Sequence, residues 1–128
     1  MEQKVRTKMR GIDISQFQGN VNFSNVKKAG IEFVIIRAGF GRYETQRDPY
    51  FERNYKAAKA AGLHVGAYWY SYAQSVDDAK QEAKVCMKII KGKQFDFPIF
   101  FDLEERSQFA KGRDHCDSLV KAFCGELE

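Results

Sequence analysis

The sequence has no long apolar run, only three cysteines, and little net charge outside its first residues. No apolar segment approaches the length of a transmembrane helix, and the basic start is not followed by the apolar stretch of a signal peptide. We therefore expect neither a membrane span nor a signal peptide in this sequence. Cys86, Cys116 and Cys124 form no C-x-x-C pair and lack metal-ligand spacing. Their odd number, at apolar positions of helix-like segments, favours buried thiols.

The formal net charge of +4 is concentrated at the N-terminus. Residues 1–10 contain four basic residues and one acidic residue, a net of +3, which leaves only +1 for the rest of the chain. No cluster of lysine and arginine is interleaved with aromatic residues, so we expect no nucleic-acid partner. We interpret residues 1–10 as a flexible basic arm, whose alternative role is attraction to an anionic surface such as a cell wall.

Length and composition favour a single globular domain. The chain has 128 residues, and 44% of them are hydrophobic, which excludes wholesale disorder. A typical eight-stranded α/β barrel needs roughly 250 residues. The chain could therefore hold about half of such a barrel.

Apolar strand-like runs alternate with amphipathic helical segments along residues 11–128. Alternation of this kind is typical of an α/β fold with a parallel sheet. Asp48-Pro49 and Ser75 carry the residue types that begin helices, and Gly30, Gly62 and Gly92 those that end them. The sequence predicts four βα units, with strands at 11–15, 32–38, 63–70 and 98–103 and helices near 23–29, 48–62, 75–92 and 114–127.

Polar residues collect on one face of the predicted sheet, because side chains alternate between the two faces of a strand. In the fourth strand Asp102 and Glu104 share a face, opposite the apolar face that suits packing against helices. The same alternation puts the following residues on the polar face of the other strands: Asp13, Arg37, Tyr68 and Tyr70. One interpretation is a structural network in which Arg37 pairs with carboxylates. The other is a carboxylate-lined cleft with aromatic walls, which suits a carbohydrate.

Two neighbouring carboxyl groups can divide acid and base work between them. Repulsion raises the pKa of one group, so it stays protonated as a general acid, while the other stays ionised. Glycoside hydrolysis has this requirement. A D-x-E pair is common by itself, but its place at a strand end beside Asp13 makes the glycosidase interpretation more specific.

Four segments of the chain resemble glycoside hydrolase family 25, the N-acetylmuramidase-type lysozymes. They occur in the order found in that family: GIDISQFQG (11–19), FVIIRAG (33–39), DPYFERNYKAAKAAGLHVGAYWYSYA (48–73) and PIFFDLEE (98–105). The resemblance covers residues 11 to about 126. It implies an enzyme that cleaves the β-1,4 bond between N-acetylmuramic acid and N-acetylglucosamine in peptidoglycan.

The resemblance also implies roles for individual residues. Glu104 is similar to the general acid, Asp102 to the partner that steers or stabilises the cationic transition state, and Asp13 to the third acid of the cleft. Arg37, Tyr68 and Tyr70 match positions that line the family's substrate groove, with barrel packing as their alternative role. No metal or organic cofactor is implied. We expect a secreted or phage-released protein that acts at the cell wall.

The catalytic domains of that family extend well beyond the length of this chain. Residues 11–128 are therefore expected to be an N-terminal half of a TIM-like barrel, whose first and fourth strands are open edges. Exposed edges favour pairing with another chain, so we expect a homo-oligomer that closes the barrel by association. The alternative function is a non-catalytic module that binds the cell wall or self-associates.

Overall fold

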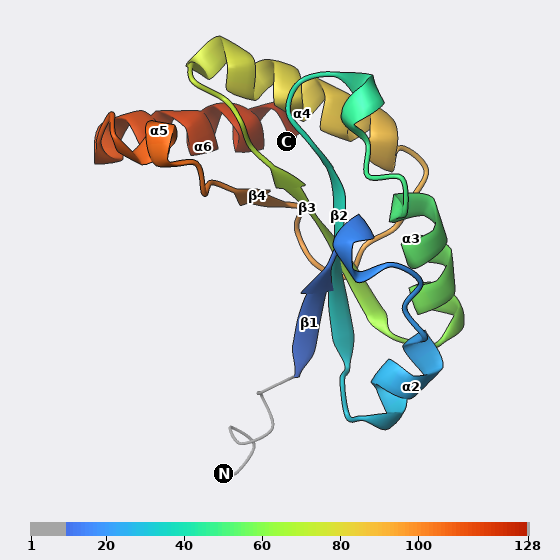
Figure 1. Cartoon of the computed structure of the whole chain (residues 1–128). Coiled ribbons are helices and arrows are strands. Elements are labelled where there is room, and N and C mark those ends of the chain that lie inside the picture. The colour runs from blue at the N-terminus through green and yellow to red at the C-terminus, as the bar shows by residue number, and fades with distance from the viewer. Residues whose placement is uncertain (1–9, 128) are drawn as a thin grey trace, which may run out of the picture.

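The computed structural model describes residues 10–127 and contains one four-stranded sheet with helices against it (Figure 1). The expected arm at residues 1–10 lies, except for Arg10, outside the described residues. All neighbouring strands are parallel, in the order β1-β2-β3-β4. The strands are β1 (Gly11–Ile14), β2 (Phe33–Phe40), β3 (His64–Tyr70) and β4 (Phe100–Asp102). The expected α/β class with a parallel sheet is confirmed, and β1 and β4 form the edges of this sheet.

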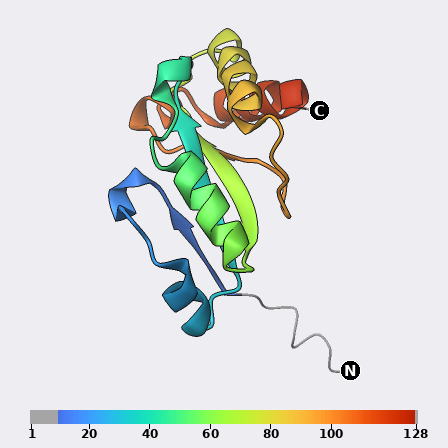
Figure 2. The same cartoon turned by 90° about the vertical axis from the view of Figure 1, so that its right-hand side faces the viewer.

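The helices cover one face of the sheet and its upper end (Figures 1 and 2). They are α2 (Phe23–Lys28), α3 (Phe51–Ala60), α4 (Val76–Ile90), α5 (Arg106–Phe109) and α6 (Arg113–Leu127). Helix α3 runs along the sheet, and α6 packs against α4 and β4. The opposite face of the sheet remains open and is concave in Figure 1. None of the helices between residues 10 and 127 has the length and apolarity needed to cross a lipid bilayer.

The helix-covered face forms the core, as the alternation of side chains predicts. Val34 and Ile36 of β2 and Val65, Ala67 and Trp69 of β3 are all fully buried. Helices contribute Phe51, Ala83, Cys86 and Phe123 to the same cluster, and Phe123 stacks on Phe101 of β4 with 4.1 Å between ring centroids. Burial of this apolar set is the main contribution to stability, at about 1.5–3 kcal/mol for each large side chain. Because the helices cover this face of the sheet, the opposite face of each strand is left accessible to a ligand.

The structure corrects several predicted boundaries. Strand β4 pairs only over Phe100–Asp102, because Pro98 has no N–H to donate and Glu105 already caps the short helix α5. The sequence did not predict this helix. Helix α3 begins at Phe51, since the Asp48 carboxylate bonds to other segments and caps only the Tyr50 N–H. Helix α4 begins after Ser75 as expected, with the Ser75 hydroxyl accepting from the Asp78 N–H.

Candidate active site

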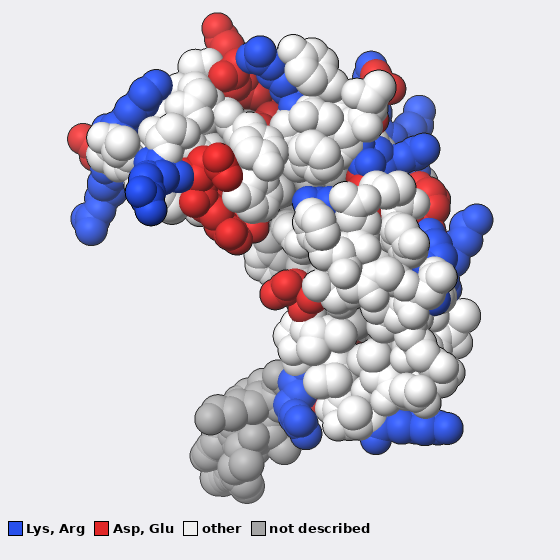
Figure 3. All heavy atoms as spheres, in the orientation of Figure 1, with Lys and Arg blue, Asp and Glu red and all other residues white. Residues whose placement is uncertain are grey.

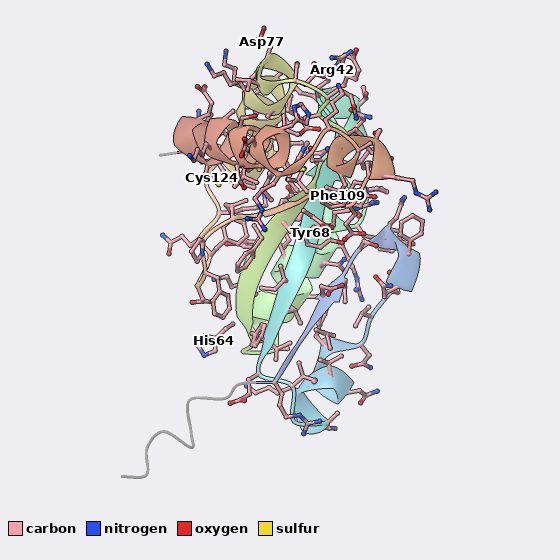
Figure 4. All side chains as sticks on the ribbon, turned by 90° about the vertical axis from the view of Figure 1, so that its left-hand side faces the viewer. Arg42, His64, Tyr68, Asp77, Phe109 and Cys124 are labelled. Atoms are coloured by element: carbon pink, nitrogen blue, oxygen red, sulfur yellow. The ribbon has the colours of Figure 1, made fainter. Side chains whose placement is uncertain are left out.

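The open face of the sheet contains an acidic groove with a volume of about 430 Å³. Every strand contributes to it, and its lining residues are Asp13, Ile35, Tyr68, Phe100, Phe101, Asp102 and Glu104. In Figure 3 acidic side chains gather on this concave side of the molecule. Figure 4 looks onto the same face and labels Tyr68 over the middle of the sheet. The structure thus brings together the three predicted acids and one of the predicted aromatic residues.

Strand register explains why these side chains meet. Asp13 of β1 is paired with Ile35 of β2, and Ile35 with Gly66 of β3. A side chain at Gly66 would place its Cβ 2.7 Å from Ile35 Cδ1, so the absence of one keeps space above the sheet. One row further along, Tyr68 is paired with Phe100. The groove therefore has an apolar floor with acidic groups on both edge strands.

Asp102 has a perturbed pKa in the groove. The side chain of Asp102 is partly buried, and this burial is the largest of the effects that raise its pKa to about 7. The hydrogen bond and negative charge of Glu104 add to the rise, and the charge of Asp13 adds the least. Hydrogen-bonded carboxyls of this kind titrate as a pair. The resemblance predicts that Glu104 donates the proton. The raised pKa lies on its neighbour Asp102, and the proton that this carboxyl group retains near neutral pH bridges the pair.

Tyr68 is a neutral donor beside the acids. Burial raises the pKa of Tyr68 to about 12; the Arg37 guanidinium opposes the rise, and the carboxylates of Asp13 and Asp102 add to it. A phenol in this state keeps its proton at any physiological pH. Tyr68 can therefore donate a hydrogen bond to a ligand in the groove.

Arg37 lies outside the lining of the groove and pairs with a different carboxylate. Arg37 Nε donates to Asp48 Oδ2 over 2.8 Å, and both side chains are buried. The guanidinium also lies over the rings of Phe17 and Phe40, 5.2 and 5.0 Å from their centroids. Its Nη2 has no hydrogen-bond partner among residues 10–127. The predicted network of Arg37 with a carboxylate therefore exists, but its partner is Asp48 and not an acid of the groove.

Tyr70 also lies beside the groove and not in its lining. Its hydroxyl donates to Glu105 Oε2 over 2.7 Å, and this bond raises the pKa of Tyr70 above its ordinary value. Its ring is 5.2 Å from that of Tyr72, which is exposed. Glu105 and Asp48, which hold Tyr70 and Arg37 beside the groove, are partners that sequence reasoning missed. The acidic run after the fourth strand was a signal for Glu105, whereas Asp48 looked like a helix cap.

No set of three histidine, cysteine or acidic residues within residues 10–127 is arranged to hold a metal ion. The chemistry of the groove comes from carboxyl groups and a phenol. Acid–base work and recognition of hydroxyl and amide groups are the tasks that such groups perform.

Comparison with known proteins gives consistent matches. The model of glycosyl hydrolases family 25 matches residues 12–128. The chain is 38% identical over 119 residues to an autolytic lysozyme of Clostridium acetobutylicum, covering 93% of the chain and 35% of that protein. A family GH25 lysozyme structure from Aspergillus fumigatus superposes with a TM-score of 0.74 at 28% identity, covering 92% of this chain and 58% of that one.

A family 25 glycosyl hydrolase structure from Bacillus anthracis has the same fold, with a TM-score of 0.78 at 22% identity over 94% of this chain and 55% of that one. The alignments span little more than a third of the length of the first curated relatives, 35 to 38%, and 21% of the lysozyme M1 of Streptomyces globisporus.

Proposed function

The chain belongs to glycosyl hydrolases family 25, and from that premise we propose that it is a muramidase acting on peptidoglycan. The reaction is hydrolysis of the β-1,4 bond between N-acetylmuramic acid and N-acetylglucosamine. The observation that carries the proposal is the hydrogen-bonded pair of Asp102 and Glu104, facing Asp13 across an open groove. The hydrolysis of a glycosidic bond requires one carboxyl group that donates a proton and a second that is ionised.

We assign the proton donor to Glu104. The proton held by Asp102 passes along their hydrogen bond to Glu104, which delivers it to the glycosidic oxygen as the bond from that oxygen to C1 breaks. This transfer leaves Asp102 ionised when positive charge develops at the sugar. Asp102 then stabilises that charge or orients the N-acetyl group of the substrate. Water completes the hydrolysis at C1, and the proton that it loses returns to the carboxyl pair.

Arg37, Tyr68 and Tyr70 are assigned to substrate binding, and Asp13 remains with the catalytic acids. Tyr68 faces the groove as a neutral hydroxyl donor. Tyr70 and Arg37 border the groove, where Tyr70 is held by Glu105 and Arg37 by Asp48. Asp13 adds negative charge that favours a cationic transition state. Because peptidoglycan is the material of the cell wall, we propose that the protein acts there after secretion or release by a phage.

A turbidity assay on purified cell walls tests this proposal. The chain is expected to clear the suspension, and Glu104→Gln to slow clearing by about 10²-fold or more, since it cannot donate the proton. Asp77→Asn is the matched control, because Asp77 is exposed on α4 and lies far from Tyr68 in Figure 4. Equal clearing by Glu104→Gln and the unaltered chain would refute the role of Glu104. Binding to walls without clearing would favour the non-catalytic module.

We also propose that the four βα units are half of a barrel that closes by association of two copies. Strands β1 and β4 occupy the sheet edges, where backbone groups are available for pairing. Beside β4 lies an apolar hollow of about 470 Å³, lined by Met87, Ile90, Pro98, Ile99, Cys124 and Leu127. Sedimentation velocity is expected to show a dimer, and Met87→Glu is expected to dissociate it. Val76→Glu is the control, because Val76 is exposed elsewhere on α4, and it is expected to leave the dimer intact. A monomer at all concentrations would refute the association.

A further inference from the structure

Three fully buried polar side chains meet outside the acidic groove, next to the C-terminal end of β3. Ser71 follows β3, Glu82 is on α4, and Gln108 is on α5; each is no more than 1% exposed. Polar groups buried this deeply destabilise a protein unless they are hydrogen-bonded. Ser71, Glu82 and Gln108 are called the Ser71 clamp below.

Ser71 is the centre of the clamp. Its hydroxyl donates to Glu82 Oε1 over 2.8 Å and accepts from Gln108 Nε2 over 3.1 Å and from the Ala73 N–H over 3.0 Å. The second oxygen of Glu82 accepts from the Tyr72 N–H over 2.8 Å. The clamp therefore holds the chain that follows β3 against helix α4.

Gln108 connects this centre to the segment after β4. Its Nε2 also donates to the Ala73 carbonyl over 3.0 Å, while its Oε1 accepts from the Glu105 N–H over 3.2 Å. A second link joins the same two segments, since the Ser71 N–H donates to the Asp102 carbonyl over 2.9 Å. Backbone groups at Asp102 and at Glu105 are thus both bound to the Ser71 region.

Glu104 lies between these two links and belongs to no helix or strand. Strand β4 is only three residues long, so its own ladder gives little support to the chain beyond Asp102. The position of Glu104 relative to Asp102 must then depend on the links at either side. A backbone held at two points three residues apart restricts where the side chain between them can lie.

We infer that Gln108, together with Ser71 and Glu82, is a positioning residue that holds Glu104 beside Asp102. The inference rests on the proposed function for its importance to catalysis, whereas the contacts that it describes are independent of activity. None of the three side chains lines the groove, so their effect passes through the segment 102–105. A group that acts in this way alters catalysis by displacing others.

The carboxyl titration of Asp102, followed by carbon NMR, tests the inference without any hydrolysis. In the unaltered chain the midpoint is expected near pH 7. Gln108→Met keeps the length of the side chain and removes both its donor and its acceptor. With Glu104 no longer held beside Asp102, we expect the midpoint to fall by about one pH unit or more. Gln74→Met is the matched control. Gln74 Nε2 donates to the hydroxyl of Ser107, which is on α5 like Gln108, but this hydrogen bond is at the surface. The midpoint in this control variant is expected to stay unchanged.

A folded Gln108→Met chain with an unchanged Asp102 midpoint would overturn the inference, even if its thermal stability fell. If that variant does not fold, amide exchange on the unaltered chain decides. The Glu105 and Ala73 amides, which donate to Gln108 and Ser71, are expected to exchange at least about 10²-fold more slowly than unstructured amides. Exchange at the unstructured rate would overturn the inference. Absence of wall clearing with both NMR results intact would refute the muramidase proposal alone.

Discussion

Asp102 in the acidic groove and Glu82 in the Ser71 clamp both have pKa values raised to about 7, for different reasons. Asp102 is half-buried in an open groove, and its carboxyl neighbours Glu104 and Asp13 add to the rise that burial begins. Glu82 is buried, and burial is the main cause that raises its pKa, with a smaller rise from the charge of Asp78, while hydrogen bonds from Tyr72 and Ser71 oppose the rise. The pKa of Asp102 is raised by burial together with neighbouring carboxyl groups. The pKa of Glu82 is raised mainly by burial, which outweighs the opposing effect of its hydrogen-bond donors.

The contrast teaches which perturbed carboxyl group is available for chemistry. A displaced pKa by itself also occurs at structural networks. Asp102 faces a groove that can hold a sugar, whereas both oxygens of Glu82 accept bonds from neighbouring protein groups. We therefore propose the groove as the site of acid–base chemistry and the clamp as its structural support.

Replacing Asp102 is expected to give the largest effect on the groove side of this comparison. Asp102→Asn removes the shared proton and the charge next to the reacting sugar, so wall clearing is expected to slow by about 10²-fold or more. Turbidity assays from pH 4 to 9 measure it, together with circular dichroism to verify folding. A rate within about threefold of the unaltered chain would contradict the role of Asp102.

Replacing Glu82 is expected to change how stability depends on pH. Because its folded pKa lies above its unfolded value of 4.5, the folded state holds the proton more tightly. Stability is therefore lost as pH rises from about 4.5 to 7, by up to about 3 kcal/mol. Glu82→Gln does not titrate and should lose less stability between pH 5 and 8, as measured by urea unfolding. An unaltered slope would show that Glu82 ionises normally.

Replacing Asp13 is expected to give the smallest effect. Asp13 is the weakest of the contributors that raise the pKa of Asp102. Asp13→Asn should therefore lower the Asp102 midpoint by less than about one pH unit, by removing one negative charge across the groove. The carbon NMR titration measures it. A fall larger than that caused by Glu104→Gln would reverse the order of the two neighbours.

The fold was predictable from the sequence where local patterns decide it. Alternation in the first three strands placed Val34, Ile36 and Trp69 in the core and left Asp13 and Tyr68 for the groove, as observed. The patterns are periodic and repeat in every strand, so single exceptions do not obscure them.

The parts that sequence reasoning missed depend on contacts between distant segments. Asp48 follows the pattern of a helix cap, and only the folded chain brings Arg37 to its carboxylate. Helix α5 is four residues long, too short to show a period, so the role of Gln108 was invisible. Which member of the Asp102–Glu104 pair has the raised pKa depends on burial of each side chain, which spacing does not determine.

The most direct test of the central claim is analysis of the new reducing ends released from purified peptidoglycan. Borohydride reduction after digestion, followed by acid hydrolysis, identifies the sugar at the cleaved bond. The account predicts the reduced form of muramic acid, since acid removes the N-acetyl group, produced by the unaltered chain and not by Glu104→Gln. The reduced form of glucosamine would contradict it. So would the absence of new reducing ends from a folded chain, whether monomeric or dimeric.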